Sequence, residues 1–294
     1  MTDTSQVDAL LDQLGLEELD VDLYRGHNPA ERHNQRVFGG LVAAQALRAA
    51  TLTIEVDHHP HSLHGYFLRG GKPGRPIVYH VERIRDGRSF STRRVVGKQY
   101  GVAIFNLTAS FHTFEEDETD YQLSLAADAG HPDDATDRVP RDDQHAAWLA
   151  RSPFHSRELG PTTPGPDGVY SSTRRVWVKA KSPLPNDRLL HACALTYATD
   201  MGAVTAAAVA KMGDRWQTAF TETMSASLDH AVWFHRPVRV DEWLYFDVHA
   251  VSNQNSRGLV RGTIHAIDGS LVASFSQEAL IRTIKPRALD PEFG

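Results

Sequence analysis

Two segments of this chain share a hydrophobic pattern that is typical of a buried helix. They are "NQRVFGGLVAAQALRAATL" and "NDRLLHACALTYATDMGAVTAAAVA". Each segment is rich in Ala and Gly and apolar on every side, which indicates a helix that is buried all round. Stretches of alternating apolar and polar residues follow each segment, with Val, Phe and Tyr at the apolar positions, and this alternation predicts β-strands.

The predicted strands repeat in the two halves of the chain. Phe67 and Arg69 of "SLHGYFLRGG" correspond to Phe234 and Arg236 of "SLDHAVWFHRP" at one common offset, and the triplet "ASF" follows in each half. An Ala-rich and Gly-rich helix can lie very close to a curved antiparallel sheet, because no large side chain separates the two layers. The sequence therefore predicts an α+β fold made of two similar, fused units.

The composition changes between these units. The segment "EEDETDYQLSLAADAGHPDDATDRVPRDD" is acidic, and "ELGPTTPGPDG" is rich in Pro and Gly, as linkers are. We expect an N-terminal unit at residues 1–115, a linker at 116–170 and a C-terminal unit at 171–288. The second helix lies farther from its first strand than the first helix does, which predicts an insertion that includes "AVAKMGDRWQT".

Charge and cysteine content narrow the function classes. A formal net charge of −6 over 294 residues argues against a general nucleic-acid or anionic-membrane binder. The single cysteine, Cys193, excludes an internal disulfide, and the first residues lack the pattern of a secretory signal. We expect a cytoplasmic protein without a membrane-spanning segment. The histidine-rich "DHHPH" at Asp57–His61 is expected to be an exposed loop, and no metal site is expected.

Three polar residues of the second half stand beside predicted core elements. They are Asp200 on the helical stripe, Ser227 before a strand and Gln277 in the last strand, and their first-half counterparts are Arg48, Pro60 and Thr113. A buried carboxylate, hydroxyl or amide needs hydrogen-bonding partners, and three such groups in one half suggest a single site. Alternatively, Asp200 caps a helical segment that begins at Met201, and Gln277 lies on the surface.

Several ordered blocks of sequence resemble one known family. The blocks "VFGGLVAAQAL", "HSLHGYFLR", "RDGRSFSTRRV", "YATD", "SLDHAVWFHRP", "SRGLVRG" and "DGSLVASFSQE", between about Val37 and Arg282, are similar to the acyl-CoA thioesterase II (TesB-type) family. The resemblance implies a double hotdog fold, in which each unit has an Ala-rich central helix wrapped by a curved antiparallel β-sheet. It also implies hydrolysis of a fatty acyl-CoA to free acid and CoA without a cofactor, and assembly into a homo-oligomer.

The family's catalytic Asp, Thr or Ser, and Gln carry over to Asp200, Ser227 and Gln277 of this chain. Asp200 would accept a proton from the attacking water, while the Ser227 hydroxyl and the Gln277 amide orient that water. Backbone N–H groups of Gly39 and Gly40 at the start of the first helix are candidates for stabilising the oxyanion. The alternative for these glycines is close packing of helix on sheet.

The CoA phosphates need cationic partners, because a phosphate is recognised best by Arg side chains. Candidates are Arg93 and Arg94 of the basic strand "RIRDGRSFSTRR", and the loop "RGGKPGR". The alternative is that this strand only presents a solvated face.

Polar residues near Ser227 are not assigned to catalysis. We expect Asp229, His230 and His235, and similarly His64, to form a local hydrogen-bond network around the start of the strand. Two other functions remain open: a hotdog enoyl-CoA hydratase, whose Asp-x-Asn-Pro-x-His type of motif is missing from this sequence, and a module that binds acyl-CoA without turnover.

Overall fold

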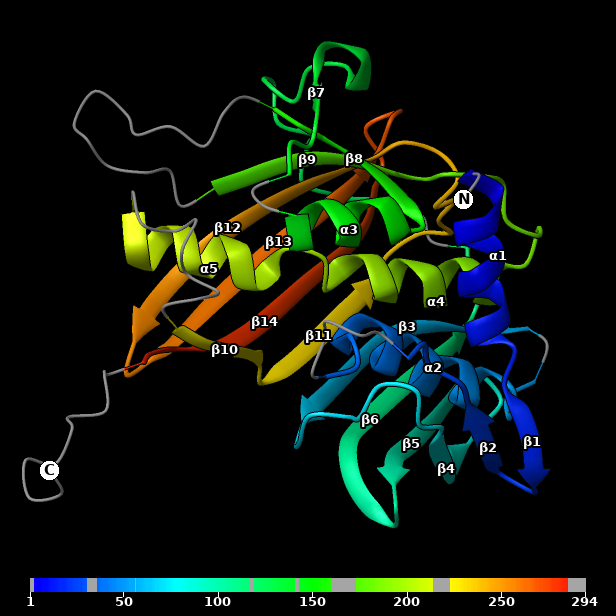
Figure 1. Ribbon diagram of the computed structural model, residues 1–294. Helices are drawn as coiled ribbons and strands as arrows, with labels where there is room; N and C mark the ends of the chain where they lie inside the picture. The colour runs from blue at the N-terminus through cyan, green and yellow to red at the C-terminus, as the bar shows by residue number, and fades with distance from the viewer. Residues whose placement is uncertain are drawn as a thin grey trace, which may run out of the picture.

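The computed structural model describes residues 3–30, 36–55, 57–116, 119–140, 143–159, 173–213 and 223–284 (Figure 1). The helices are α1 (Asp3–Leu14), α2 (Gly39–Thr51), α3 (Asp143–Arg151), α4 (Arg188–Thr199) and α5 (Ala203–Met212), with a short 3-10 turn, η1, at Pro132–Asp134. The strands are β1 (Glu17–Asp20), β2 (Leu23–Gly26), β3 (His58–Phe67), β4 (Ile77–Asp86), β5 (Phe90–Gln99), β6 (Val102–Thr113), β7 (Thr136–Asp137), β8 (Phe154–Glu158), β9 (Thr173–Ala180), β10 (Thr223–Ser227), β11 (Asp229–Phe234), β12 (Leu244–Gln254), β13 (Arg257–Ala266) and β14 (Leu271–Thr283).

The described strands join into one long antiparallel sheet. Its order is β1-β2-β4-β5-β6-β3-β11-β14-β13-β12-β9-β8-β7, and β10 pairs with β14. The two halves meet in the middle, where β3 and β11 pair from Tyr66 opposite Asp229 to Ser62 opposite Trp233. Outward from this seam, β3, β6, β5 and β4 occupy the same relative positions as β11, β14, β13 and β12. The internal repeat predicted from the sequence is therefore confirmed.

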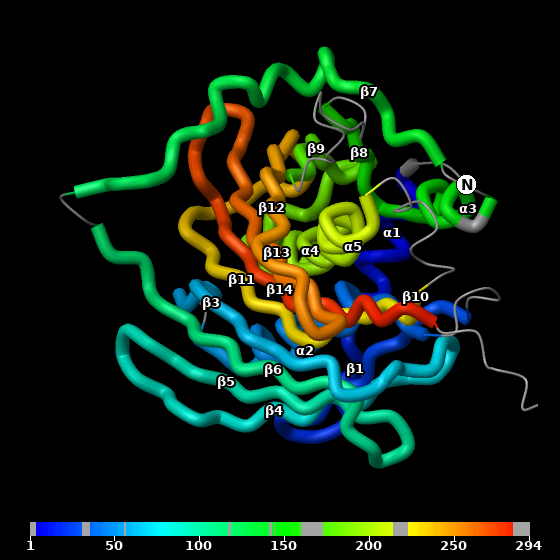
Figure 2. Tube along the Cα trace, turned by 90° about the vertical axis from the view of Figure 1, so that its left-hand side faces the viewer, coloured from blue at the N-terminus to red at the C-terminus, as the bar shows by residue number. Residues whose placement is uncertain are grey.

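Small residues allow the helices to pack tightly in the concave side of this sheet. In α2, the side chains of Ala43, Ala46 and Leu47 have no exposed surface. Helix α2 packs against β4, β5 and β6 and along α4, whereas α5 packs against β12, β13 and β14. Figure 2 shows β12, β13 and β14 curving around α4 and α5. Two curved sheets on central helices, joined edge to edge, make up the α+β double hotdog architecture that the resemblance implied.

The predicted insertion corresponds in part to an extra helix. The residues of "AVAKM" within it belong to α5, which has no counterpart after α2, and residues 214–222 lie outside the described part of the chain. Residues 116–170, expected as a linker, hold η1, β7, α3 and β8. Strand β8 pairs with β9, with Phe154 opposite Ala180, so this segment extends the edge of the second sheet.

The prediction of an exposed loop at Asp57–His61 is wrong. His58 begins β3, and its side chain is only 2% exposed. One helical stretch of the described residues, Arg188–Met212, is long and apolar enough to cross a membrane by length and composition alone. Because 78% of its most apolar window is buried inside the protein, it has the character of a core helix.

Candidate active site

A break between α4 and α5 places Asp200 at the end of a buried helix. Helix α4 ends at Thr199, and Asp200 has φ −80° and ψ −11°. Gly202 then adopts φ 96°, a left-handed conformation that glycine reaches without strain, and it is the residue that precedes the first turn of α5. The interpretation of Asp200 as the cap of the following helix is therefore wrong.

The three side chains singled out from the sequence contact one another. The Ser227 hydroxyl donates to Asp200 Oδ1 at 3.1 Å. The Gln277 amide donates to the same oxygen at 2.8 Å and to Ser227 Oγ at 2.7 Å. Asp200 is 7% exposed and Gln277 is fully buried, so the surface alternative for Gln277 is wrong. A carboxylate, a hydroxyl and an amide thus converge from α4, β10 and β14.

A β-bulge turns Ser227 towards Asp200. Ser227 in β10 lies opposite Ala279 of β14, whereas Ala231 in β11 lies opposite Ser276 of the same strand. Between these two pairs, the segment that joins β10 to β11 contains one residue more than the segment of β14 opposite it. Because side chains alternate along a strand, the extra residue lets Ser227 and His230 face the same side of the sheet. Without it, residues three positions apart would point to opposite faces.

Helix α2 approaches Asp200 closely because it begins with two glycines. A Cβ atom on Gly39 would lie 2.9 Å from Asp200 Oδ2, and one on Gly40 would lie 2.6 Å from the Tyr197 carbonyl oxygen. The Gly40 N–H donates a hydrogen bond to the Asp200 carboxylate. Gly40 therefore does not match the predicted oxyanion donor, and both glycines permit the close packing that was the alternative.

Burial changes the acidity of this carboxyl group. Desolvation raises the pKa of Asp200 to about 6, and hydrogen bonds from Gln277, Ser227 and the Gly40 N–H only partly oppose that rise. A carboxyl group with a pKa close to neutral can accept a proton during a reaction and release it afterwards.

A cavity of about 740 Å³ opens beside Asp200 and Ser227. Apolar side chains in its wall include Val42, Phe67, Ile104 and Val204. Its basic side chains are Arg36, Arg69, Arg138 and Arg151. A cavity with apolar and cationic regions suits a ligand that carries a hydrocarbon part and anionic groups.

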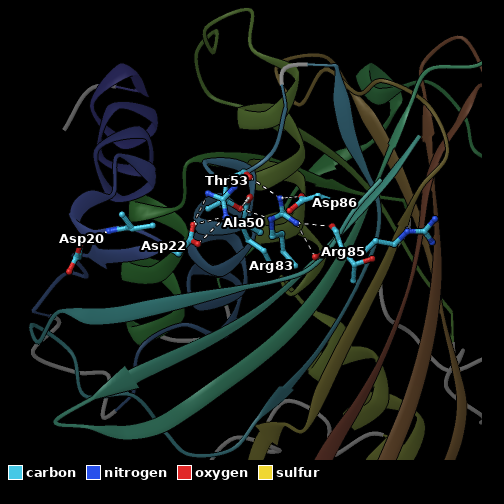
Figure 3. Close-up of polar contacts among 10 residues, drawn as sticks. Asp20, Asp22, Ala50, Thr53, Arg83, Arg85 and Asp86 are labelled. Atoms are coloured by element: carbon cyan, nitrogen blue, oxygen red, sulfur yellow. Dashed lines mark hydrogen bonds and ion pairs between the residues drawn. The ribbon is translucent and has the colours of Figure 1, made fainter. Parts of the chain in front are cut away.

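The prediction that Arg93 and Arg94 bind phosphate is not supported by their positions. Arg93 is 1% exposed and donates to the Thr53 hydroxyl at 2.8 Å, to the Thr53 carbonyl at 2.9 Å and to the Arg85 carbonyl at 2.9 Å, and it also pairs with Asp86. Figure 3 shows this cluster, with Thr53, Arg85 and Asp86 labelled. Arg94 is exposed and pairs with Glu82, and neither arginine lines the cavity.

Strand alternation explains the error. Arg93 lies two residues before Val95 in β5, so the two side chains share the buried face. At the edge of that face, Arg93 reaches Thr53, which follows the end of α2. The Thr53 carbonyl is a backbone acceptor that needs a donor, and Arg93 supplies it. The spacing of Arg93 and Val95 in the sequence indicated that both side chains lie on the same face of the strand. The sequence did not show that Thr53 supplies hydrogen-bond partners for Arg93.

Asp229, His230 and His235 each contact a different polar partner, so they do not share the single network that was predicted around the start of β11. Asp229 Oδ1 accepts from the Glu278 N–H at 2.6 Å, and His235 Nε2 lies 2.9 Å from Ser274 Oγ. His230 contacts Gln277 directly and thereby belongs to the candidate site, a link that the sequence analysis missed. His64 contacts the ring of Trp233 edge-on at 5.0 Å. Across the described ranges, no group of three or more His, Cys, Asp or Glu residues is placed to hold a metal ion.

Family models of acyl-CoA thioesterases match both halves of the chain. One described as "Acyl-CoA thioesterase N-terminal domain" matches residues 28–112, and one described as "Acyl-CoA thioesterase" matches residues 154–280. The first match covers most of the N-terminal unit and the second covers β8 to most of β14.

Individual relatives match over almost the whole length. Acyl-coenzyme A thioesterase 8 of Mus musculus is 34% identical, over 93% of this chain and 88% of the relative. Acyl-CoA thioesterase 2 of Haemophilus influenzae is 32% identical, over 93% and 96%. The crystal structure of acyl-CoA thioesterase II TesB2 from Mycobacterium marinum superimposes with a TM-score of 0.78 at 39% identity, over 94% and 99%. The chain therefore belongs to the acyl-CoA thioesterase II (TesB-type) family and is an acyl-CoA thioesterase, a thioester hydrolase.

Proposed function

We propose that this thioesterase hydrolyses fatty acyl-CoA with a water molecule that Asp200, Ser227 and Gln277 orient. The proposal is carried by the mutual hydrogen bonds of these three side chains at the wall of a cavity. In such an arrangement the carboxylate accepts a proton from the water, while the hydroxyl and the amide limit the positions that the water can take.

The reaction then needs no covalent acyl-enzyme. The water oxygen attacks the thioester carbonyl carbon as Asp200 takes one of the water protons. The tetrahedral intermediate collapses, the carbon–sulfur bond breaks, and its electron pair leaves with the CoA sulfur. Asp200 returns the proton to that sulfur, which yields the carboxylic acid and the CoA thiol and restores the carboxylate.

The Gly39 N–H is the backbone group that we assign to the developing oxyanion. Gly39 begins α2, and the first N–H groups of a helix have no partners within that helix. The positive end of the α2 dipole also favours negative charge at this position. Support for this assignment comes from the short approach of Gly39 to Asp200.

Variants of Ser227 and Gln277 test the assignment of the water site. In Ser227→Ala and Gln277→Ala the kcat for thiol release from acyl-CoA should fall by about a hundredfold, because the water loses its fixed position. Ser274→Ala is the matched control, since this hydroxyl lies on β14 and contacts His235 instead of the cavity. Wild-type kcat in the first two variants would refute the site. Loss of an enoyl-CoA double bond without thiol release would favour hydration instead.

We assign the CoA phosphates to basic residues of the cavity wall, chiefly Arg36, Arg69 and Arg151. Arg69 belongs to the loop "RGGKPGR" that the sequence analysis favoured. Replacing each by Ala should raise the KM for acyl-CoA about tenfold with little change in kcat, because a charged hydrogen bond of roughly 1.5 kcal/mol is lost on binding. Arg94→Ala is the control, as this side chain pairs with Glu82 away from the wall. An unchanged KM in all three variants would contradict the assignment.

We also propose that the chain forms a homo-oligomer through the outer face of its sheet. Tyr66 and Trp233 are exposed on the central strands β3 and β11, and Phe90 is exposed on β5. Exposed apolar groups of this kind favour association. Light scattering should give a multiple of 32.6 kDa for the wild type and a lower mass for Trp233→Glu. A mass of 32.6 kDa for the wild type at assay concentration would overturn this proposal.

A further inference from the structure

A buried histidine touches the candidate site from behind. His230 of β11 is 1% exposed, and its ring lies between Gln277 of β14 and Thr199 at the end of α4. The Nδ1 atom is 2.7 Å from Gln277 Oε1, and the Nε2 atom is 2.8 Å from Thr199 Oγ1. Both ring nitrogens therefore have partners, and one of these partners is the amide that contacts Asp200 and Ser227.

The hydrogen bonds of the Gln277 amide determine which ring nitrogen carries the proton. The two N–H groups of the amide already donate to Asp200 Oδ1 and Ser227 Oγ. The atom that faces His230 is thus the amide oxygen, which can only accept. The Nδ1 atom must therefore be protonated and donate to it.

The remaining ring nitrogen then has to accept a hydrogen bond. Burial lowers the pKa of His230 to about 4, so the ring is neutral near pH 7 and carries a single N–H. With the proton on Nδ1, the Nε2 atom has a lone pair that faces the Thr199 hydroxyl at 2.8 Å. That hydroxyl also donates to the Thr196 carbonyl at 2.8 Å, so its single proton is shared between two acceptors.

The internal repeat shows that the core alone does not require a histidine at this position. Because Phe67 corresponds to Phe234, the first-unit counterpart of His230 is Leu63, which is fully buried in β3. The counterpart of Gln277 is Thr113. The unit without the glutamine thus has an aliphatic side chain where the other unit has a hydrogen-bonding ring.

From this geometry we propose that His230 is a positioning residue that fixes the orientation of the Gln277 amide. The inference rests on the proposed function of Gln277. A reversed amide would place its oxygen against the Asp200 carboxylate and its N–H groups against the Nδ1–H of His230, and both contacts are repulsive. His230 therefore keeps the amide N–H groups directed at the water site.

Two replacements of His230 separate this role from simple filling of space. His230→Leu copies the residue that the first unit uses and removes the donor, so kcat should fall by about tenfold to a hundredfold while KM stays within about twofold. His230→Asn retains a side-chain N–H close to the position of Nδ1 and should recover most of the lost kcat. Melting curves of both variants check folding.

A double variant tests whether His230 acts through Gln277. If it does, His230→Leu should change the kcat of Gln277→Ala by less than about twofold, because the amide that it positions is already missing. Wild-type kcat in His230→Leu, equal loss in His230→Asn, or a further loss of the full size in the double variant would each overturn the inference. Wild-type kcat in Gln277→Ala would refute the water site itself, so the two failures are distinguishable.

Discussion

At the scale of single residues, burial gives Asp200 both a pKa near neutral and an energetic cost. Desolvation raises the pKa of its carboxyl group to about 6, above the ordinary value of 3.8. A carboxyl group whose pKa is raised on folding contributes most to stability at low pH, and this contribution is lost as the pH rises through about 6. The charged form, which is the base in the proposed reaction, is therefore the form that the fold tolerates least.

The rate should depend on pH in a way that follows from this pKa. The carboxylate is the reactive form in the proposed reaction, so kcat/KM should rise with pH through an apparent pKa of about 6. Gln277→Ala removes a hydrogen bond that favours the carboxylate, and it should shift this apparent pKa upwards. Measuring kcat/KM between about pH 5 and about pH 8 tests both statements. A flat profile over that range would exclude Asp200 as the titrating base.

At the scale of elements, two local irregularities create the site. The break between α4 and α5 directs Asp200 to its partners, and the bulge between β10 and β11 brings Ser227 to the same face as His230. The helix break was partly visible in the sequence, because Asp200 and Gly202 are poor residues for a helix interior. The bulge was not visible in the sequence. A one-residue change of register depends on how the strands pair with β14, and it does not alter the apolar and polar alternation of so short a segment in a recognisable way.

The buried arginine of β5 should matter for stability and not for binding. Arg93→Met keeps the aliphatic length but leaves the Thr53 hydroxyl and the Thr53 and Arg85 carbonyls without this donor, so the free energy of unfolding should fall by roughly 3–5 kcal/mol. Denaturant titration measures the change, with the exposed Arg94→Met as control. A raised KM with unchanged stability would instead support the phosphate role first predicted for Arg93.

At the scale of the whole molecule, the chain uses two similar units to build one set of polar groups. The repeat, the Ala-rich helices and the candidate residues could all be predicted from the sequence, because patterning sets the fold and residues found in only one copy stand out against it. The partners of buried polar groups could not, as the misread Arg93 and the missed contact of His230 with Gln277 show. Such contacts join strands and helices that are far apart in the sequence.

The central claim is that Asp200 acts as the base in thioester hydrolysis, and thiol release by the wild type and by Asp200→Asn tests it most directly. The substrates should be acyl-CoAs of increasing chain length, with a disulfide dye as reporter and melting curves as the folding control. We expect the wild type to release thiol and the variant to lose activity by about a hundredfold to ten-thousandfold, as for the loss of a general base. Activity of a folded Asp200→Asn protein within about tenfold of the wild type would contradict the account.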